Sequence, residues 1–341
     1  MSHMRERIFI YSLSALLMVF LGVSGSSQST ENPLAGGKKP VAFNEVWAYL
    51  MAGEEGKVTG IEPFTDVCYF SAAINYRGKL AGQKKAPAVF AGKTTRVHLV
   101  IAELSNPALM HFCLNTGYGL RSSLIRDIVD AAADYHGVQL DFESVPAAEK
   151  DAFIGFVREL RSALGGKKIL SIAVPPRRVS VDDAYDYAAL AAVSDRIIVM
   201  AYDQHWSTSS PGAVASLWWC REVTAYAKSR VSADKLIMGI PLFARAWQDK
   251  KLARALTMNG LEEIKKNRSP EVQVCDRNGP YFTYREDVTV TVYFDDLDSI
   301  MQKMKLYSGE RIKGISFWRI GQGSPDLWSY IDVSAVSSVD K

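Results

Sequence analysis

One short stretch of the sequence alternates apolar side chains with polar and ionisable ones. It runs from His136 to Glu143 and reads His-Gly-Val-Gln-Leu-Asp-Phe-Glu. Successive side chains of a β-strand point to opposite faces, so Gln139, Asp141 and Glu143 are expected to share one face. The two carboxyl groups then lie about 7 Å apart along the backbone, and the charge of one disfavours ionisation of the other. A carboxyl that stays protonated can act as a general acid, and we assign this role to Glu143.

The rest of the chain predicts a scaffold that places this stretch among parallel strands. Apolar runs alternate with segments whose apolar residues recur at helical spacing. Strands are expected over residues 46–51, 67–74, 97–104, 136–143, 169–174, 197–202, 236–243 and 315–318. Helices are expected over residues 124–135, 153–164, 184–192, 218–228 and 297–306.

Eight strands separated mostly by helices predict an α/β fold, a closed (β/α)8 TIM barrel. Such barrels carry their chemistry at the carboxyl ends of the strands, and Glu143 stands at the end of its strand. An open, doubly wound sheet is the alternative fold. It is disfavoured because no glycine-rich phosphate-binding turn follows the first strand.

The connection between the seventh and eighth strands is longer than a usual loop. It contains a helix-like segment at 261–266 and strand-like segments at 271–275, 281–284 and 288–292. We therefore expect a small α+β insertion of residues 248–292 within a barrel domain of residues 41–333. An insertion here lies on the catalytic face, where it either forms one wall of a cleft or is a purely structural elaboration.

The amino-terminal residues are typical of an export signal. Arg5 and Arg7 precede an apolar run from Ile8 to Val23, and small residues follow. An uncleaved anchor helix is the alternative, but the run is shorter than the roughly 20 apolar residues that span a bilayer. We predict a signal peptide over residues 1–27, a linker over 28–40 and a flexible tail over 334–341. The protein is then secreted, periplasmic or at the cell surface, with no membrane partner beyond the signal.

Charge and cysteine spacing exclude other classes of function. The net charge of +3, from 40 basic and 37 acidic residues, is too small to indicate a nucleic-acid partner. The four cysteines lack the spacing of a zinc site, and we expect neither a metal nor an organic cofactor. Cys68 and Cys113 could form a disulfide in an exported protein, but Cys68 is more typical of a small buried apolar residue.

Written as D-G-x-D-x-D-x-E, the stretch from His136 to Glu143 resembles the catalytic strand of glycoside hydrolase family 18. This family contains the chitinases and related N-acetylglucosaminidases. Asp141 and Glu143 occupy the last two acidic positions, whereas His136 and Gln139 replace the first two. A histidine just before a strand is more typical of a structural residue. Gln139 cannot titrate, but its amide can orient Asp141 through a hydrogen bond.

Three further segments resemble motifs of the same family at the ends of later strands. They are Met-Ala-Tyr-Asp at 200–203, Gly-Ile-Pro-Leu-Phe-Ala-Arg at 239–245 and Gly-Ile-Ser-Phe-Trp at 314–318. Phe243 and Ala244 replace the tyrosine and glycine of the second motif. The sequence of residues 200–219 is similar to sequences of the branch that includes bacterial spore-cortex and cell-wall glucosaminidases.

The resemblance implies a retaining, substrate-assisted reaction, in which the 2-acetamido oxygen of the substrate attacks the anomeric carbon. It implies that Asp141 orients the acetamido group, that Tyr202 donates a hydrogen bond to its carbonyl, and that Trp318 is a platform under the reacting sugar. Arg245 is assigned to sugar hydroxyls or to a structural carboxylate. Further substrate contacts are assigned to Gln139, Met200 and Asp203.

The expected function is therefore hydrolysis of β-1,4 linkages next to N-acetylglucosamine in a polysaccharide or oligosaccharide, by a monomer. Chitin, peptidoglycan and N-glycan cores all fit as substrates, and so do endo and exo action. The alternative is a weakly active or inactive chitooligosaccharide-binding lectin on the same barrel. Because such lectins of the family usually lose the catalytic glutamate, the presence of Glu143 favours an enzyme.

Overall fold

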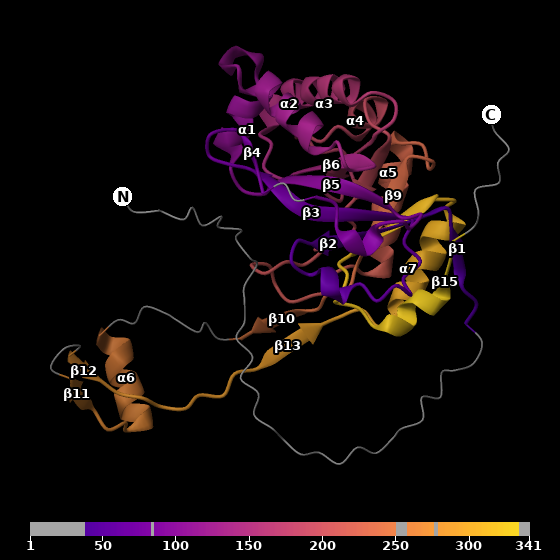
Figure 1. Ribbon diagram of the computed structural model, residues 1–341. Coiled ribbons are helices and arrows are strands. Elements are labelled where there is room, and N and C mark those ends of the chain that lie inside the picture. The colour runs from indigo at the N-terminus through magenta and orange to yellow at the C-terminus, as the bar shows by residue number, and fades with distance from the viewer. Residues whose placement is uncertain (1–37, 83–84, 250–257, 276–278, 334–341) are drawn as a thin grey trace.

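The predicted TIM barrel is present in the computed structural model, which describes residues 38–82, 85–249, 258–275 and 279–333 (Figure 1). Eight parallel strands follow one another around the barrel, and the first pairs with the last. They are β2 (Glu45–Met51), β3 (Asp66–Ile74), β5 (Arg96–Glu103), β6 (Gly137–Phe142), β7 (Ile169–Val174), β8 (Arg196–Val199), β9 (Leu236–Pro241) and β14 (Gly314–Trp318). The short strand β4 (Leu80–Ala81) pairs antiparallel with the end of β3.

Helices pack around the outside of the strands (Figure 1). They are α1 (Pro107–Leu114), α2 (Leu120–Ala131), α3 (Lys150–Leu164), α4 (Tyr187–Ala192), α5 (Leu217–Arg230) and α7 (Leu297–Gly309). In α3, Phe153, Phe156 and Leu160 recur at helical spacing and are buried. They belong to the main hydrophobic core, together with Val138 and Leu140 of the neighbouring strand β6.

The barrel interior has its own smaller apolar cluster. It includes Trp47, Tyr49, Cys68 and Val100 from three neighbouring strands. Cys68 is a free, fully buried thiol, as is Cys113 in the outer core, so these two residues form no disulfide. The prediction that Cys68 is a small buried apolar residue is confirmed.

Several element boundaries differ from the sequence-based expectation. Helix α1 was not predicted, because its apolar residues leave no clear polar face. Its first turn is capped by Asn106, whose side chain accepts a hydrogen bond from Leu109 N at 2.9 Å. Strand β8 ends at Val199 instead of residue 202, since two tight turns follow it. Strand β9 ends at Pro241 instead of residue 243.

The expected α+β insertion follows β9. It contains β10 (Arg245–Gln248), α6 (Met258–Arg268), β11 (Gln273–Cys275), β12 (Gly279–Tyr281) and β13 (Val290–Tyr293). β10 pairs antiparallel with β13, and this ribbon begins at Arg245, opposite Tyr293. Figure 1 shows α6, β11 and β12 projecting from the barrel beyond the ribbon. The ribbon is thus the base on which the insertion stands.

Charged side chains fill the amino end of the barrel. Glu45 accepts a hydrogen bond from Arg196 Nε at 3.0 Å. Asp66 is fully buried and contacts Arg96 Nε at 2.8 Å and His98 Nε2 at 2.7 Å. Burial opposes the charge of Asp66, but the hydrogen bonds from His98 and Arg96 hold its pKa below the ordinary value. The buried charges at this end are therefore paired, as stability requires.

The first and last strands of the described chain pair with each other outside the barrel. β1 (Val41–Phe43) pairs in parallel with β15 (Ile331–Val333), with Phe43 opposite Val333, and leads through Asn44 into the amino end of β2. The predicted signal peptide at 1–27 and tail at 334–341, and all but the last residues of the predicted linker at 28–40, lie outside the described residues. None of the described helices has the length and apolar character needed to cross a membrane.

Gly137 opens β6 at a position where a larger residue does not fit. A Cβ atom built there lies 2.4 Å from His98 Nδ1 and 2.4 Å from the carbonyl oxygen of Ile169. We expect Gly137→Ala to lower the free energy of unfolding by about 1–3 kcal/mol, the usual cost of extra volume in a packed interior. Chemical denaturation measures this loss. Gly166→Ala is the control, because nothing lies within 4 Å of its Cβ position. Equal losses in the two variants would contradict the prediction.

Candidate active site

The inward face of β6 carries the polar residues that the sequence singled out. Gln139 and Asp141 are buried, whereas Val138 and Leu140 face the outer core, so the predicted alternation is confirmed. Glu143 follows the last residue of β6 and is exposed at the open, carboxyl end of the barrel. Its backbone N–H donates to the carbonyl of Glu103 at 2.8 Å, which extends the pairing of β6 with β5 by one step.

Gln139 lies one step below the carboxyl pair and is held by an aromatic group. Its Nε2 donates to the hydroxyl of Tyr49 at 2.7 Å. The ring of Tyr49 packs against Trp318, with ring centres 5.0 Å apart, and Phe70 meets Trp318 edge-on at 5.7 Å. Trp318 is half-buried at the end of β14. The predicted sugar platform therefore rests on two aromatic rings of the barrel interior.

Asp141 and Glu143 influence each other's ionisation. Burial, followed by the charge of Glu143, raises the pKa of Asp141 well above its ordinary value. Glu143 reaches solvent, yet the protein packed around its carboxyl and the nearby charge of Asp203 raise its pKa as well. Within the described part of the chain, no hydrogen-bond donor reaches Asp141 Oδ1. The pair therefore keeps a proton to higher pH than isolated carboxyl groups do, which suits it to donate one.

Tyr202 lies just beyond β8, in the turns that end that strand. Its N–H donates to the carbonyl of Met200 at 2.7 Å. Burial and the charges of Asp141 and Glu143 raise the pKa of its hydroxyl, which therefore stays protonated as a hydrogen-bond donor. Gly239 of β9 makes room for the ring, because a Cβ atom there lies 2.9 Å from Tyr202 Cε1. The charges of Asp141 and Glu143 act on the Tyr202 hydroxyl because it lies near the carboxyl pair.

Asp203 is held beside this group by Arg245. Both Nε and Nη2 of Arg245 donate to Asp203 Oδ1, at 2.8 and 2.6 Å. The backbone of Asp203 is left-handed, with φ of 59°, which is uncommon outside glycine. Phe243 packs against the Tyr202 ring, and the guanidinium of Arg245 lies 5.3 Å from the Phe243 ring centre. Of the two roles predicted for Arg245, the structure shows the contact with a carboxylate.

Two other residues from the sequence motifs, Met200 and His136, contact the backbone of neighbouring strands. Met200 is half-buried directly after β8, and its N–H donates to the carbonyl of Val174 at 3.0 Å. His136 precedes β6 at the amino end of the barrel, where its Nδ1 accepts a hydrogen bond from Val97 N at 3.0 Å. His136 is therefore far along the strand from Glu143 and has a structural contact, as expected.

Sequence reasoning missed the roles of two residues that shape the site. Tyr49, which holds Gln139, shares one face of β2 with Trp47 and alternates with Ala48 and Leu50 of the outer core. That alternation places it on an inward face by the same rule that was applied to β6. Gly239 was noted only as the first residue of the motif at 239–245, and the sequence does not indicate that it makes room for the ring of Tyr202.

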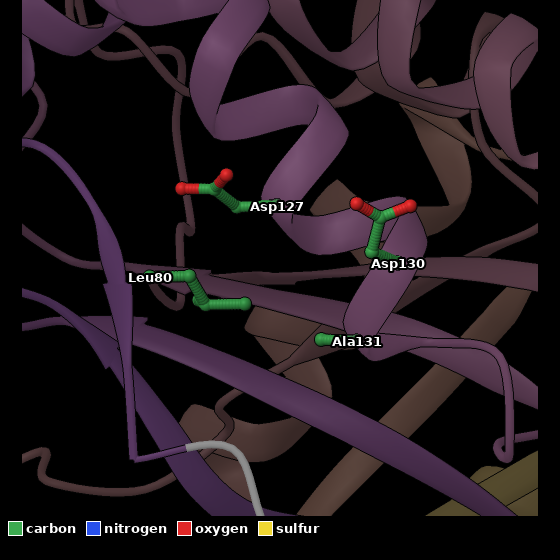
Figure 2. A pocket seen from close by; sticks show the side chains of 4 residues that line it. All are labelled: Leu80, Asp127, Asp130 and Ala131. Atoms are coloured by element: carbon green, nitrogen blue, oxygen red, sulfur yellow. The ribbon is translucent and has the colours of Figure 1, made fainter.

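A hollow of about 390 Å³ lies elsewhere, between α2 and β4, and Figure 2 shows the four side chains that line it. They are Leu80, Asp127, Asp130 and Ala131. Lys79 Nζ lies 3.9 Å from Asp127 Oδ2. None of the residues assigned to chemistry lines this hollow, and we regard it as a solvated surface of α2.

The fold and the site define a class of protein. A closed parallel barrel that presents two adjacent carboxyl groups, a half-buried phenol and an indole at its carboxyl end is the arrangement of a barrel glycosidase. The sequence profile of glycosyl hydrolases family 18 matches residues 115–323. The chain belongs to this family.

Several known bacterial proteins are similar to the chain. The putative sporulation-specific glycosylase YdhD of Bacillus subtilis (strain 168) is 32% identical over 64% of this chain, which spans only 56% of YdhD. The cortical fragment-lytic enzyme of Bacillus cereus is 28% identical over 79% of this chain and 67% of its own length. The crystal structure of the Bacillus cereus spore cortex-lytic enzyme SleL has a TM-score of 0.67 and 25% identity, over 86% of this chain and 74% of SleL.

The charge of Asp203 should be measurable at Glu143. In Asp203→Asn the negative charge is lost and Arg245 is released from its partner, and both changes favour the ionised form of Glu143. We expect the pKa of Glu143 to fall, so that its carboxyl loses its proton at lower pH than in the wild type. Titration of ¹³C-carboxyl-labelled glutamate by NMR measures this shift, with Asp332→Asn in β15 as the control. An unchanged or higher pKa would show that Asp203 does not act on Glu143.

Proposed function

We propose that the chain is a retaining glycoside hydrolase that cleaves β-1,4 linkages next to N-acetylglucosamine with help from the substrate's own acetamido group. The observation that carries this proposal is the placement of Asp141 and Glu143 on one inward face at the open end of a family 18 barrel, with the phenol of Tyr202 coupled to both. No second carboxylate is needed as nucleophile in such a mechanism.

In the first step Glu143 is the acid. Its proton passes to the glycosidic oxygen as the bond from that oxygen to the anomeric carbon breaks, and the acetamido oxygen forms a new bond to the same carbon. The product is a cyclic, positively charged intermediate on the sugar. Asp141 accepts a hydrogen bond from the acetamido N–H and stabilises this charge, while Tyr202 donates to the acetamido oxygen and orients it for attack.

In the second step Glu143 is the base. It takes a proton from water, whose oxygen attacks the anomeric carbon and reopens the ring to the acetamido group. Two inversions at one carbon leave its configuration retained. The raised pKa of Glu143 serves both steps, because a carboxyl that holds its proton at moderate pH also takes one readily from water. Trp318 supports the apolar face of the sugar throughout.

Peptidoglycan of the spore cortex or cell wall is the substrate we favour among chitin, peptidoglycan and N-glycan cores. Support comes from relatives whose names describe cortex-lytic or sporulation-specific activity. We also propose that the protein is exported and acts as a monomer. The export proposal rests on Arg5 and Arg7 and on the apolar run that follows them.

The proposed acid makes a direct prediction. Glu143→Gln keeps the shape of the side chain but removes the proton donor, so hydrolysis should fall by about 10²–10⁴-fold while the protein still folds. Release of new reducing ends from N-acetylglucosamine oligomers measures the loss. Glu103→Gln is the matched control, because Glu103 ends the neighbouring strand and its carboxylate only caps a loop, accepting from Ser105 N at 3.0 Å. Wild-type turnover in a folded Glu143→Gln variant would remove Glu143 from the mechanism.

The proposed nucleophile makes a second prediction, about substrates. If the acetamido oxygen attacks, then oligomers that lack the N-acetyl group on the sugar at the non-reducing side of the bond should not be cleaved, even where they bind. A thiazoline analogue of the cyclic intermediate should inhibit, since mimics of transition-state-like species bind more tightly than the substrate does. Product analysis by mass spectrometry tests this. Efficient cleavage of cellulose oligomers, or a sugar ester on Asp141, would instead indicate a mechanism with two carboxylates. Binding without cleavage of any acetylated substrate would indicate a lectin.

A further inference from the structure

The backbone on both sides of Glu143 is held by a single hydroxyl group from a distant segment. The hydroxyl of Tyr185 donates to the carbonyl of Phe142 at 2.6 Å. It also accepts a hydrogen bond from the N–H of Val145 at 3.4 Å. Phe142 directly precedes Glu143, and Val145 follows it by two residues. The proposed acid therefore lies within a short loop whose two ends meet at one oxygen atom.

The Tyr185 hydroxyl takes the place of hydrogen bonds from β7, because β7 has already diverged from β6 at this level. β6 pairs with β7 only as far as Leu140, which lies opposite Ile172. On its other side, β6 continues to pair with β5 through Phe142 and on to the N–H of Glu143. Beyond Leu140 the β7 side of the strand thus lacks its ladder, and the hydroxyl of Tyr185 takes the carbonyl that points there.

Tyr185 is itself held in place by its contacts, so its hydroxyl can fix the position of the loop that carries Glu143. Its own N–H donates to Asp183 Oδ1 at 2.8 Å, and Asp183 in turn accepts from Arg177 Nε at 3.0 Å. The ring is buried and packs edge-on against Phe153 of α3, with ring centres 6.1 Å apart. Burial and the nearby charges of Glu143, Asp183 and Asp141 raise the pKa of the phenol. The hydroxyl therefore remains a donor over the whole range in which the carboxyl groups titrate.

We infer that Tyr185 is a positioning residue for the catalytic acid: its hydroxyl fixes the loop that aims Glu143 at the glycosidic oxygen. This inference rests on the proposed function of Glu143. A phenylalanine would fill the same space between β6 and α3, so packing alone does not account for the hydroxyl and its two backbone contacts. Since proton transfer depends steeply on the placement of the donor, loss of these contacts should affect turnover more than binding.

The experiment compares Tyr185→Phe with Tyr187→Phe. Tyr187 is a matched control, because it is two residues away and is buried. Its hydroxyl donates to the carbonyl of Pro175, which does not belong to the loop around Glu143. We expect Tyr185→Phe to lower kcat on an N-acetylglucosamine oligomer by about ten-fold or more with little change in KM, within the range that small misplacements cause. Tyr187→Phe should keep kcat, and the two variants should have similar Tm values.

A second substrate separates positioning from general damage. An activated aryl glycoside of N-acetylglucosamine has a leaving group that departs without a proton, so a misplaced acid matters less for it. The deficit of Tyr185→Phe should therefore shrink markedly on this substrate. A deficit of the same size on both substrates, or a kcat within two-fold of that of Tyr187→Phe, would overturn the inference.

Two further outcomes are interpreted separately from this comparison of variants. If the wild-type protein cleaves no acetylated oligomer and no aryl glycoside, the proposed function fails, irrespective of Tyr185. If Tyr185→Phe does not fold, Asp183→Asn takes its place. This substitution loosens the segment that carries Tyr185 and leaves every residue of the candidate active site unchanged. The same pattern, a lower kcat with unchanged KM and a smaller deficit on the aryl glycoside, is expected there. Its absence would count against the inference.

Discussion

Closure of the barrel by β2 is the constraint on which the rest of the structure depends. β2 pairs on one side with β3 and on the other with β14, so no edge remains and the inward side chains of all eight strands must fill one enclosed space. The space is filled in layers. Paired charges around Asp66 occupy the amino end, aromatic and aliphatic side chains such as Trp47 occupy the middle, and the carboxyl pair stands at the other end. The side chains of each layer pack against those of the next layer.

The middle layer determines what the upper layer can do. Gln139 sits where the family motif has an acid, and its amide donates to Tyr49. Because an amide does not titrate, Asp141 has only Glu143 as an ionisable neighbour on its own strand. The pH dependence of the site is therefore set by Asp141 and Glu143 together with Asp203, whose nearby charge raises the pKa of Glu143.

Much of this organisation could be predicted from the sequence. The alternation of Val138 and Leu140 with Gln139 and Asp141 revealed both the strand and its catalytic face, because period-two patterning survives in any buried strand that carries function on one side. The order of the strands followed from their alternation with helices. The strand ends were less predictable. The turns after Val199 depend on hydrogen bonds between close neighbours that apolar periodicity does not encode.

The remaining features of the site depend on contacts between residues far apart in the sequence. Tyr185 lies in a loop before α4, in a stretch that gives no local signal of a contact with β6. Gly239 matters because the ring of Tyr202 passes over it, and Arg245 matters because Asp203 turns towards it. Such contacts follow from tertiary geometry, so they become visible only when the strands are placed side by side.

The pairing of β1 with β15 affects the seam where the barrel closes. β1 leads into β2 and β15 follows β14, while β2 and β14 pair with each other inside the barrel. The first and last parts of the described chain are therefore joined twice, once by the closing pair of barrel strands and once by an outer pair beside α7. Loosening of the seam has to break both pairs together, which protects the barrel from fraying at the point where its first and last strands meet.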